Sequence, residues 1–264
     1  MVLGLFLSLA MTGLVQAKEK GGVDELPAAF APFEGMVGAW KGVARPATNR
    51  VRGWSETHSW AWTFAKGKPV GMSLSIEGGK TFKKGALSYD GATKRYTLTA
   101  TDPAGKPVVY VGPAQGKTLL LDRSAKLPDG ALERITIRPT SNMIRYTMLV
   151  DRREAGAPQY KNAIDVGLTK EGESFAAGAG GSNLPKCIIT GGAGSLSVSH
   201  NGVTYPVCCT GCVEQFKEEP EKYIARAAAR TKEKQDGKPA ESKAKGRDDG
   251  EFDGLVEPPK KKGN

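Results

Sequence analysis

A repeated pattern of short strands and turns constrains the fold of this chain more than any other feature. Runs of β-branched and aromatic residues alternate with turns rich in Gly, Pro, Asp and Lys, such as 77–80 (EGGK) and 90–93 (DGAT). The expected strands are 39–44, 55–64, 70–76, 83–89, 96–101, 108–111, 118–122, 132–138, 143–150 and 161–168. Short strands joined by short turns predict an antiparallel meander.

A single sheet of about ten twisted strands tends to curl into a barrel, which also removes its exposed edges. Several strands alternate in polarity: Tyr96, Leu98 and Ala100 are separated by threonines. One face is therefore apolar and the other polar, as in a barrel wall that faces solvent. We predict a mainly β chain with an antiparallel β-barrel, and a two-sheet sandwich is the main alternative.

The first strand carries a short motif, Gly38-Ala39-Trp40. It resembles the G-x-W signature of lipocalins and of lipocalin-like bacterial domains. The resemblance implies a lipocalin-like barrel over residues 26–175 in which Trp40 plugs the base.

The barrel admits a second functional hypothesis, a carrier of a small apolar ligand. Large apolar side chains are available to line a cavity, although they could equally fill the barrel core: Trp54, Trp60, Trp62, Phe64 and Met72.

The sequence offers no positive sign of catalysis, and we expect no enzyme. The carboxylates of the barrel have no spacing that pairs them for acid/base chemistry: Glu56, Glu133, Asp151 and Asp165. His58 is the single histidine of this region. Related barrels hold haem iron through a histidine, but a lone histidine on a strand is more often structural or exposed. Phosphate-binding loops, nucleophile elbows and HExxH motifs are absent from the sequence.

All four cysteines lie in one stretch, residues 186–224. Twenty residues separate Cys187 from Cys208, Cys209 follows directly, and Cys212 closes the set. Zn²⁺ and Cu(I) favour thiolate ligands, and cysteines close to a helix start can meet a distant one at a single point. This spacing is compatible with a soft-metal site and equally with disulfides.

The elements around the cysteines are a hairpin and helices. Asn201-Gly202 is a strong two-residue hairpin signal between 195–199 and 203–207, and a helical pattern follows Cys212 until Pro220, which breaks it and starts a second helix. A unit of this size buries little apolar surface. We therefore expect a metal ion or disulfides to hold it together.

The C-x20-C-x3-C spacing, with Tyr205 before the cysteine pair and Phe216, Pro220 and Tyr223 after it, resembles the YHS/TRASH heavy-metal-binding module. The resemblance implies a small α+β, treble-clef-like module over residues 184–230 that binds Zn or Cu(I). By position, Cys187, Cys208 and Cys212 match its metal thiols.

The fourth ligand stays open. Thr190 occupies the place where many relatives have a second ligand. Cys209, His200, a solvent molecule or nothing could complete the site, and three thiolates suit Cu(I) or an incomplete Zn site. In an exported protein, a disulfide from Cys187 to Cys208 or Cys212 is the alternative.

The remaining segments set the expected context. Residues 1–17 resemble a secretory signal peptide, which predicts export to a periplasmic or extracellular location. Residues 176–183 form a Gly/Ala/Ser linker, and residues 231–264 are a charged tail expected to be disordered.

The formal net charge is +10, but Lys and Arg are spread along the whole chain. We therefore expect no nucleic-acid partner and at most peripheral attraction to anionic lipid or cell wall. The main prediction is an exported binding protein that holds one Zn or Cu(I) ion for buffering, transfer or sensing, with a metal-handling protein as its partner.

Overall fold

The structure is a computed structural model that describes residues 26–140, 143–171 and 184–236. The predicted signal peptide (1–17), the predicted linker (176–183) and most of the predicted disordered tail (231–264) lie outside the described residues.

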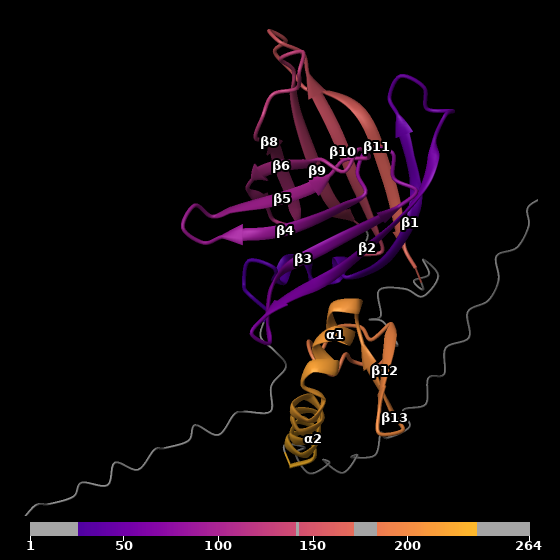
Figure 1. Ribbon diagram of the computed structural model, residues 1–264, viewed down its shortest axis with the longest axis vertical. Coiled ribbons are helices and arrows are strands. Elements are labelled where there is room, and N and C mark those ends of the chain that lie inside the picture. The colour runs from indigo at the N-terminus through magenta and orange to yellow at the C-terminus, as the bar shows by residue number, and fades with distance from the viewer. Residues whose placement is uncertain (1–25, 141–142, 172–183, 237–264) are drawn as a thin grey trace, which may run out of the picture.

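The larger part is a closed antiparallel barrel of ten strands, which confirms the predicted fold class (Figure 1). The barrel strands are β1 (Gly38–Pro46), β2 (Trp54–Ala65), β3 (Lys68–Glu77), β4 (Lys84–Asp90), β5 (Arg95–Thr101), β6 (Pro107–Gly112), β8 (Thr118–Arg123), β9 (Leu132–Thr140), β10 (Arg145–Arg153) and β11 (Lys161–Lys170). A two-residue strand, β7 (Ala114–Gln115), pairs with β8. Each of the ten predicted strands is confirmed, with ends that differ by a few residues.

The closure of the sheet excludes the alternative sandwich. Neighbouring strands pair in chain order, β1 pairs with β11, and β6 pairs with β8 through Tyr110↔Arg123 and Val111↔Asp122. Because every long strand has a partner on both sides, the barrel leaves few unpaired backbone groups at sheet edges.

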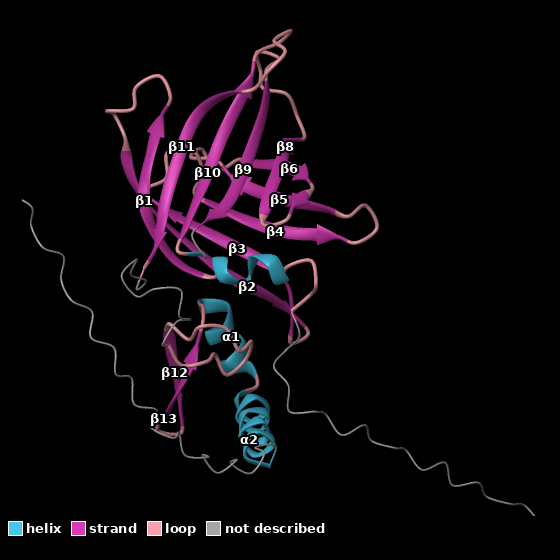
Figure 2. Ribbon diagram, turned by 180° about the vertical axis from the view of Figure 1, so that it is seen from behind, coloured by secondary structure: helices cyan, strands magenta, loops and turns pink. Residues whose placement is uncertain are grey.

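A short 3-10 helix, η1 (Ala31–Met36), lies at one end of the barrel, between the strands and the cysteine-containing part (Figure 2). Trp40 is fully buried beneath it and its indole N–H donates to the Met36 carbonyl at 2.7 Å. Lys170 Nζ donates to the Gly35 carbonyl at 2.8 Å and lies 5.4 Å from the Trp40 ring centroid. The first-strand tryptophan therefore plugs this end of the barrel, as the G-x-W motif predicted.

The smaller part contains the cysteines and is called here the cysteine module. It consists of a hairpin of β12 (Leu196–His200) and β13 (Val203–Val207), followed by α1 (Thr210–Glu218) and α2 (Pro220–Asp236). Asn201 and Gly202 both have positive φ, 50° and 78°, as a type I′ hairpin turn requires.

Pro220 begins α2, as predicted, but the end of this helix differs from the prediction. The helix runs to Asp236, so the proposed boundary of the disordered tail at residue 231 is wrong. The reason is that Lys, Glu and Gln are good helix formers, and a high density of charge does not by itself end a helix.

The cysteine module packs on an open edge of β2 (Figure 1). β1 pairs with β2 only as far as Gly38↔Trp60, whereas β3 continues to Ala65↔Lys68. The end of β2 beyond Trp60 thus has a partner on one side alone, and α1 covers the other side. This placement gives the Trp62 backbone N–H, at the otherwise unpaired edge, an acceptor in the cysteine module.

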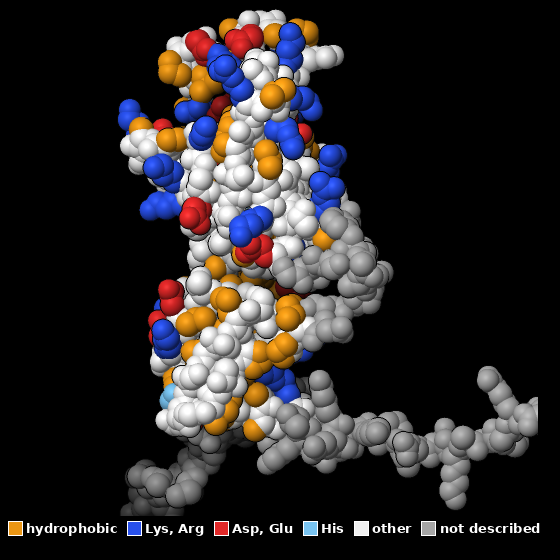
Figure 3. Space-filling model, turned by 90° about the vertical axis from the view of Figure 1, so that its right-hand side faces the viewer, with side chains coloured by type: hydrophobic (Ala, Val, Ile, Leu, Met, Phe, Trp, Pro, Cys, Tyr) orange, Lys and Arg blue, Asp and Glu red, His pale blue; other side chains and the backbone are white. Residues whose placement is uncertain are grey.

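None of the described helices has the length and apolar character needed to cross a membrane. On the face seen in Figure 3, Lys and Arg side chains are dispersed over the barrel wall, with fewer Asp and Glu side chains among them.

Candidate metal centre

Cys187 lies in a tight turn that precedes the hairpin. Its backbone N–H donates to the Gly192 carbonyl at 2.7 Å, and the Gly191 N–H returns to the Cys187 carbonyl at 3.0 Å. Gly191 has a φ of 76°, a left-handed conformation that favours glycine. The turn folds the chain back on itself, and the Cys187 thiol is fully buried.

Three of the four sulfurs converge. Cys208 follows β13, and Cys212 lies in the first turn of α1. The Sγ atoms of Cys187, Cys208 and Cys212 all lie within 4.8 Å of one another, and those of Cys208 and Cys212 are 3.5 Å apart. Zn–S bonds of about 2.3 Å in a tetrahedral site place sulfurs roughly 3.8 Å apart. These three residues, called here the cysteine cluster, therefore have the spacing of a metal site before any ion is bound.

Hydrogen bonds among the three thiols shift their pKa values in opposite directions. Bonds from Cys208 and Cys212 lower the pKa of Cys187, and the same bonds, together with burial, raise the pKa of the two donors. Burial lowers the pKa of Arg230 on α2, and attraction to Cys187 opposes this shift. The Arg230 guanidinium donates to the Ile188 carbonyl at 2.7 Å, so a cation stands beside the turn that holds the first thiol.

Cys209 is buried beside the cluster but takes a different partner. Its Sγ lies 3.9 Å from Cys208 Sγ and accepts a hydrogen bond from the Trp62 backbone N–H at 3.4 Å. The Trp62 N–H belongs to the end of β2 that does not pair with β1. The thiol of Cys209 therefore links the cysteine module to the barrel wall.

Thr190 and His200, the other side chains considered at the fourth position, lie at different distances from the cysteine cluster. Thr190 is buried with its Oγ1 3.4 Å from Cys208 Sγ, so a hydroxyl stands at the place expected from the family pattern. His200 lies outside the cluster, because its Nε2 is 2.9 Å from Glu221 Oε1 and its ring packs edge-on against Phe216. Among the described residues, three thiols converge within 4.8 Å, and the Cys209 thiol lies beside them.

Replacing Cys209 by alanine is expected to leave metal binding at about one equivalent, because the three converging thiols are unchanged. We expect the free energy of unfolding to fall by about 1–2 kcal/mol, since the Trp62 N–H loses its acceptor and a small cavity forms. Metal analysis and urea denaturation of the same sample measure both quantities. Complete loss of metal would instead make Cys209 a ligand.

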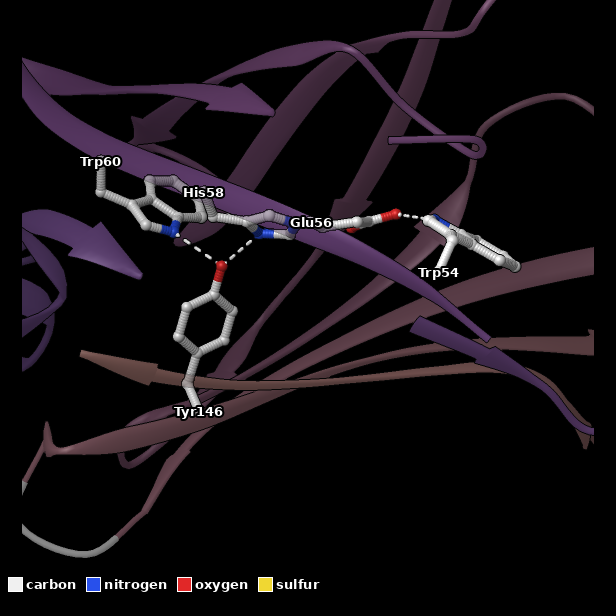
Figure 4. Close-up of polar contacts among 5 residues, drawn as sticks. All are labelled: Trp54, Glu56, His58, Trp60 and Tyr146. Carbon is white, nitrogen blue, oxygen red and sulfur yellow. Dashed lines mark hydrogen bonds and ion pairs between the residues drawn. The ribbon is translucent and has the colours of Figure 1, made fainter. Parts of the chain in front are cut away.

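A hydrogen-bonded network of five side chains lies inside the barrel (Figure 4). The sequence analysis did not predict it. His58 is fully buried; its Nε2 is 2.7 Å from Glu56 Oε2 and its Nδ1 contacts the Tyr146 hydroxyl. The Trp54 indole donates to Glu56 Oε1 at 2.6 Å, and the Trp60 indole donates to the Tyr146 hydroxyl at 3.3 Å. These five residues are called here the interior chain.

The interior chain gives Glu56 a partner that the sequence analysis did not identify. Glu56 lies two residues before His58 on the same strand, so both side chains point into the barrel. Burial raises the pKa of Tyr146, so its hydroxyl keeps its proton. Both ring nitrogens of His58 have partners within the interior chain, Glu56 and Tyr146. This is the arrangement of a structural histidine rather than of an iron ligand.

The predicted lining of an apolar cavity is largely core. Trp60, Trp62 and Met72 are each 1% exposed, and Trp54 and Phe64 are partly buried against the same core. The two large cavities beside the cysteine module both lie outside the barrel.

Comparisons with known proteins assign no function. No protein-family model matches the chain, and no curated protein matches it. Among solved structures, the crystal structure of Rv2717c from M. tuberculosis is similar at 16% identity and a TM-score of 0.34; the match covers 56% of this chain and 99% of that chain. The resemblances to YHS/TRASH modules and to lipocalins accordingly stay predictions from sequence motifs.

Proposed function

We propose that this chain is an exported protein that binds one soft metal ion, Zn²⁺ or Cu(I), through Cys187, Cys208 and Cys212. The observation that carries the proposal is the convergence of three buried sulfurs within 4.8 Å, from a turn, a strand end and a helix start. Thiolates in this number and spacing are the ligands that soft metals prefer.

The number of thiols favours an exchangeable ion over a purely structural one. Structural zinc sites are usually closed by four protein ligands, whereas this cluster has three thiols and a neighbouring hydroxyl. A site with an open position can pass its ion to another thiol, so buffering or transfer to a metal-handling protein fits better than permanent cross-linking.

The alternative function, a carrier of a small apolar ligand, has weaker support. Bulky side chains that are less than 2% exposed occupy the barrel core, Trp40, Trp60, Trp62, Tyr110 and Tyr146 among them. The interior chain holds its polar atoms in mutual hydrogen bonds, so they are engaged with one another rather than directed at a ligand. We propose no catalytic activity.

Protein purified without chelator or reductant is expected to carry about one equivalent of Zn or Cu, measured by mass spectrometry. A Cys187→Ser variant should carry less than about a tenth of an equivalent, because a neutral hydroxyl is a poor ligand for either ion. Thiol titration should count four free thiols in the unsubstituted protein after the metal is removed, as all four cysteines are free in the structure, and one fewer in Cys187→Ser.

The matched control is Ser195→Ala, which changes a hydroxyl near the cluster without removing a thiol; Ser195 Oγ donates to the Cys208 carbonyl at 3.4 Å. This variant should keep its metal. Metal-free protein with fewer than four titratable thiols until reduction would mean disulfides, and the proposal would then be abandoned.

A further inference from the structure

A cleft of about 780 Å³ lies where α1 meets the turn between β2 and β3. It lies within the size range of small-ligand pockets, roughly 300–1,000 Å³, and is far larger than a metal ion needs. Its lining comes from both parts of the chain: from the barrel, the end of β2 and the following turn, with Phe64 and Lys66, and from the cysteine module, α1 with Glu214, Gln215 and Glu218.

Two carboxylates on this lining have no counter-ion. Glu214 and Glu218 are exposed, stand four residues apart on α1, and form no ion pair with any described residue. Like charges at this spacing face each other on a helix and destabilise it. Lys66 lies on the same lining, yet it forms no ion pair with either carboxylate, and neither does any other Lys or Arg in the described part of the chain.

A buried amide on the same helix also lacks a partner. Gln215 lies between Glu214 and Glu218 in sequence, is 4% exposed and lines the cleft. Its side chain forms no hydrogen bond with any residue that the structure describes. Because Gln215 lines the cleft, its amide oxygen and amino group are available to a ligand there.

The ends of the cleft differ in chemistry. At one end, Glu219 is already neutralised by Lys222, with Oε2 and Nζ 2.8 Å apart against the turn at Gly67. Near the first turn of α1, the ring of Phe64 lies close to Gly211 and offers an apolar wall. A ligand would therefore meet free negative charge and a free amide along α1, beside an aromatic surface.

We propose that this cleft binds an organic cation, a protonated alkylamine or a guanidinium. Its charge would lie against Glu214 and Glu218, its N–H groups would donate to the Gln215 carbonyl, and its alkyl stem would pack on Phe64. Charge-assisted hydrogen bonds of this kind are the strong ones in polar recognition. The site is independent of the metal centre, because none of these residues belongs to the cysteine cluster.

The test is calorimetric titration of the metal-loaded full chain with agmatine, which carries both a guanidinium and an amine, and with neutral 1,4-butanediol. Agmatine is expected to bind and the diol is not. A Glu214→Gln/Glu218→Gln double variant should weaken agmatine binding at least tenfold. A Gln215→Leu variant should weaken it several-fold, because it removes the acceptor and keeps the apolar bulk.

The matched control is Glu77→Gln, which neutralises an exposed carboxylate at the end of β3 outside the cleft and should change binding less than twofold. A capped Gly-Arg-Gly peptide separates the sources of the cation: tighter binding of the peptide indicates a side chain of a protein partner, and tighter binding of agmatine indicates a small molecule. Equal affinity for agmatine and the diol, no binding of either cation, or full affinity in the double variant would overturn the proposal.

Discussion

A Glu56→Ala variant is expected to lose about 3–5 kcal/mol of unfolding free energy, the cost typical of removing one partner from a buried ionic or hydrogen-bonded pair. The carboxylate accepts hydrogen bonds from two donors, the partly buried Trp54 indole and the fully buried His58 ring. Truncation leaves both donors in the barrel without an acceptor and removes volume from the core. Urea denaturation followed by tryptophan fluorescence measures the loss.

A Glu56→Gln variant should lose much less. Its amide oxygen can still accept from Trp54, and its amino group can donate to His58 Nε2 if the ring takes the other tautomer. His58 Nδ1–H would then donate to the Tyr146 hydroxyl. Glu77→Ala, at an exposed position of the next strand, should cost less than about 0.5 kcal/mol. A loss below about 1 kcal/mol for Glu56→Ala would mean that the interior chain adds little to the stability of the barrel.

The barrel was predictable because its signals are local. Strand propensity, period-two alternation and turn residues each act over fewer than a dozen positions, and together they located all ten barrel strands. Closure then followed from strand number, since a long twisted sheet is more stable when its edges meet. The Trp40 plug followed from a three-residue motif.

The three converging thiols were predictable from spacing and resemblance, because the hairpin between Cys187 and Cys208 returns the chain to its starting point. The role of Cys209 was not predictable in this way. Its partner, the Trp62 backbone, lies 147 residues earlier, and the contact exists only because β1 stops short of the end of β2. No local pattern encodes where a neighbouring strand ends.

The interior chain was also not predicted, because it joins residues that lie far apart in the sequence. The Glu56–His58 spacing of two residues was visible and, on a strand that alternates with apolar residues, places both side chains in the core. Tyr146, which completes the chain, lies 88 residues away from His58. An inward-facing Glu–His pair on an otherwise apolar strand face is the signal that could have predicted a buried network.

A Gly211→Ala variant is expected to destabilise the protein by about 2 kcal/mol, because overpacking against a rigid neighbour typically costs 1–3 kcal/mol. Helix propensity alone predicts the opposite sign, a gain of up to about 1 kcal/mol for alanine in a helix. The structure reverses the sign because a Cβ at this position would lie 2.0 Å from the Trp62 carbonyl oxygen. That oxygen is backbone of the barrel wall and cannot rotate away, so α1 itself must move.

The displacement of α1 has a specific consequence that a general loss of packing would not produce. Cys209 immediately precedes α1, so its Sγ should withdraw from the Trp62 N–H, the amide that it accepts from at 3.4 Å. Hydrogen exchange at Trp62 should therefore become much faster in Gly211→Ala, while amides of β9 and β10 on other strands of the barrel keep their protection. The metal content should stay near one equivalent, since all three converging thiols belong to the cysteine module.

Gly91→Ala is the matched control, because no atom lies within 4 Å of a Cβ at that position and its φ is not positive. It should leave stability and Trp62 exchange nearly unchanged. Unchanged Trp62 protection in Gly211→Ala would show that the cysteine module is not held on the open edge of β2 by this contact. Loss of metal together with loss of protection would show that the barrel wall also holds the cysteine cluster in shape, so that docking and metal binding depend on each other.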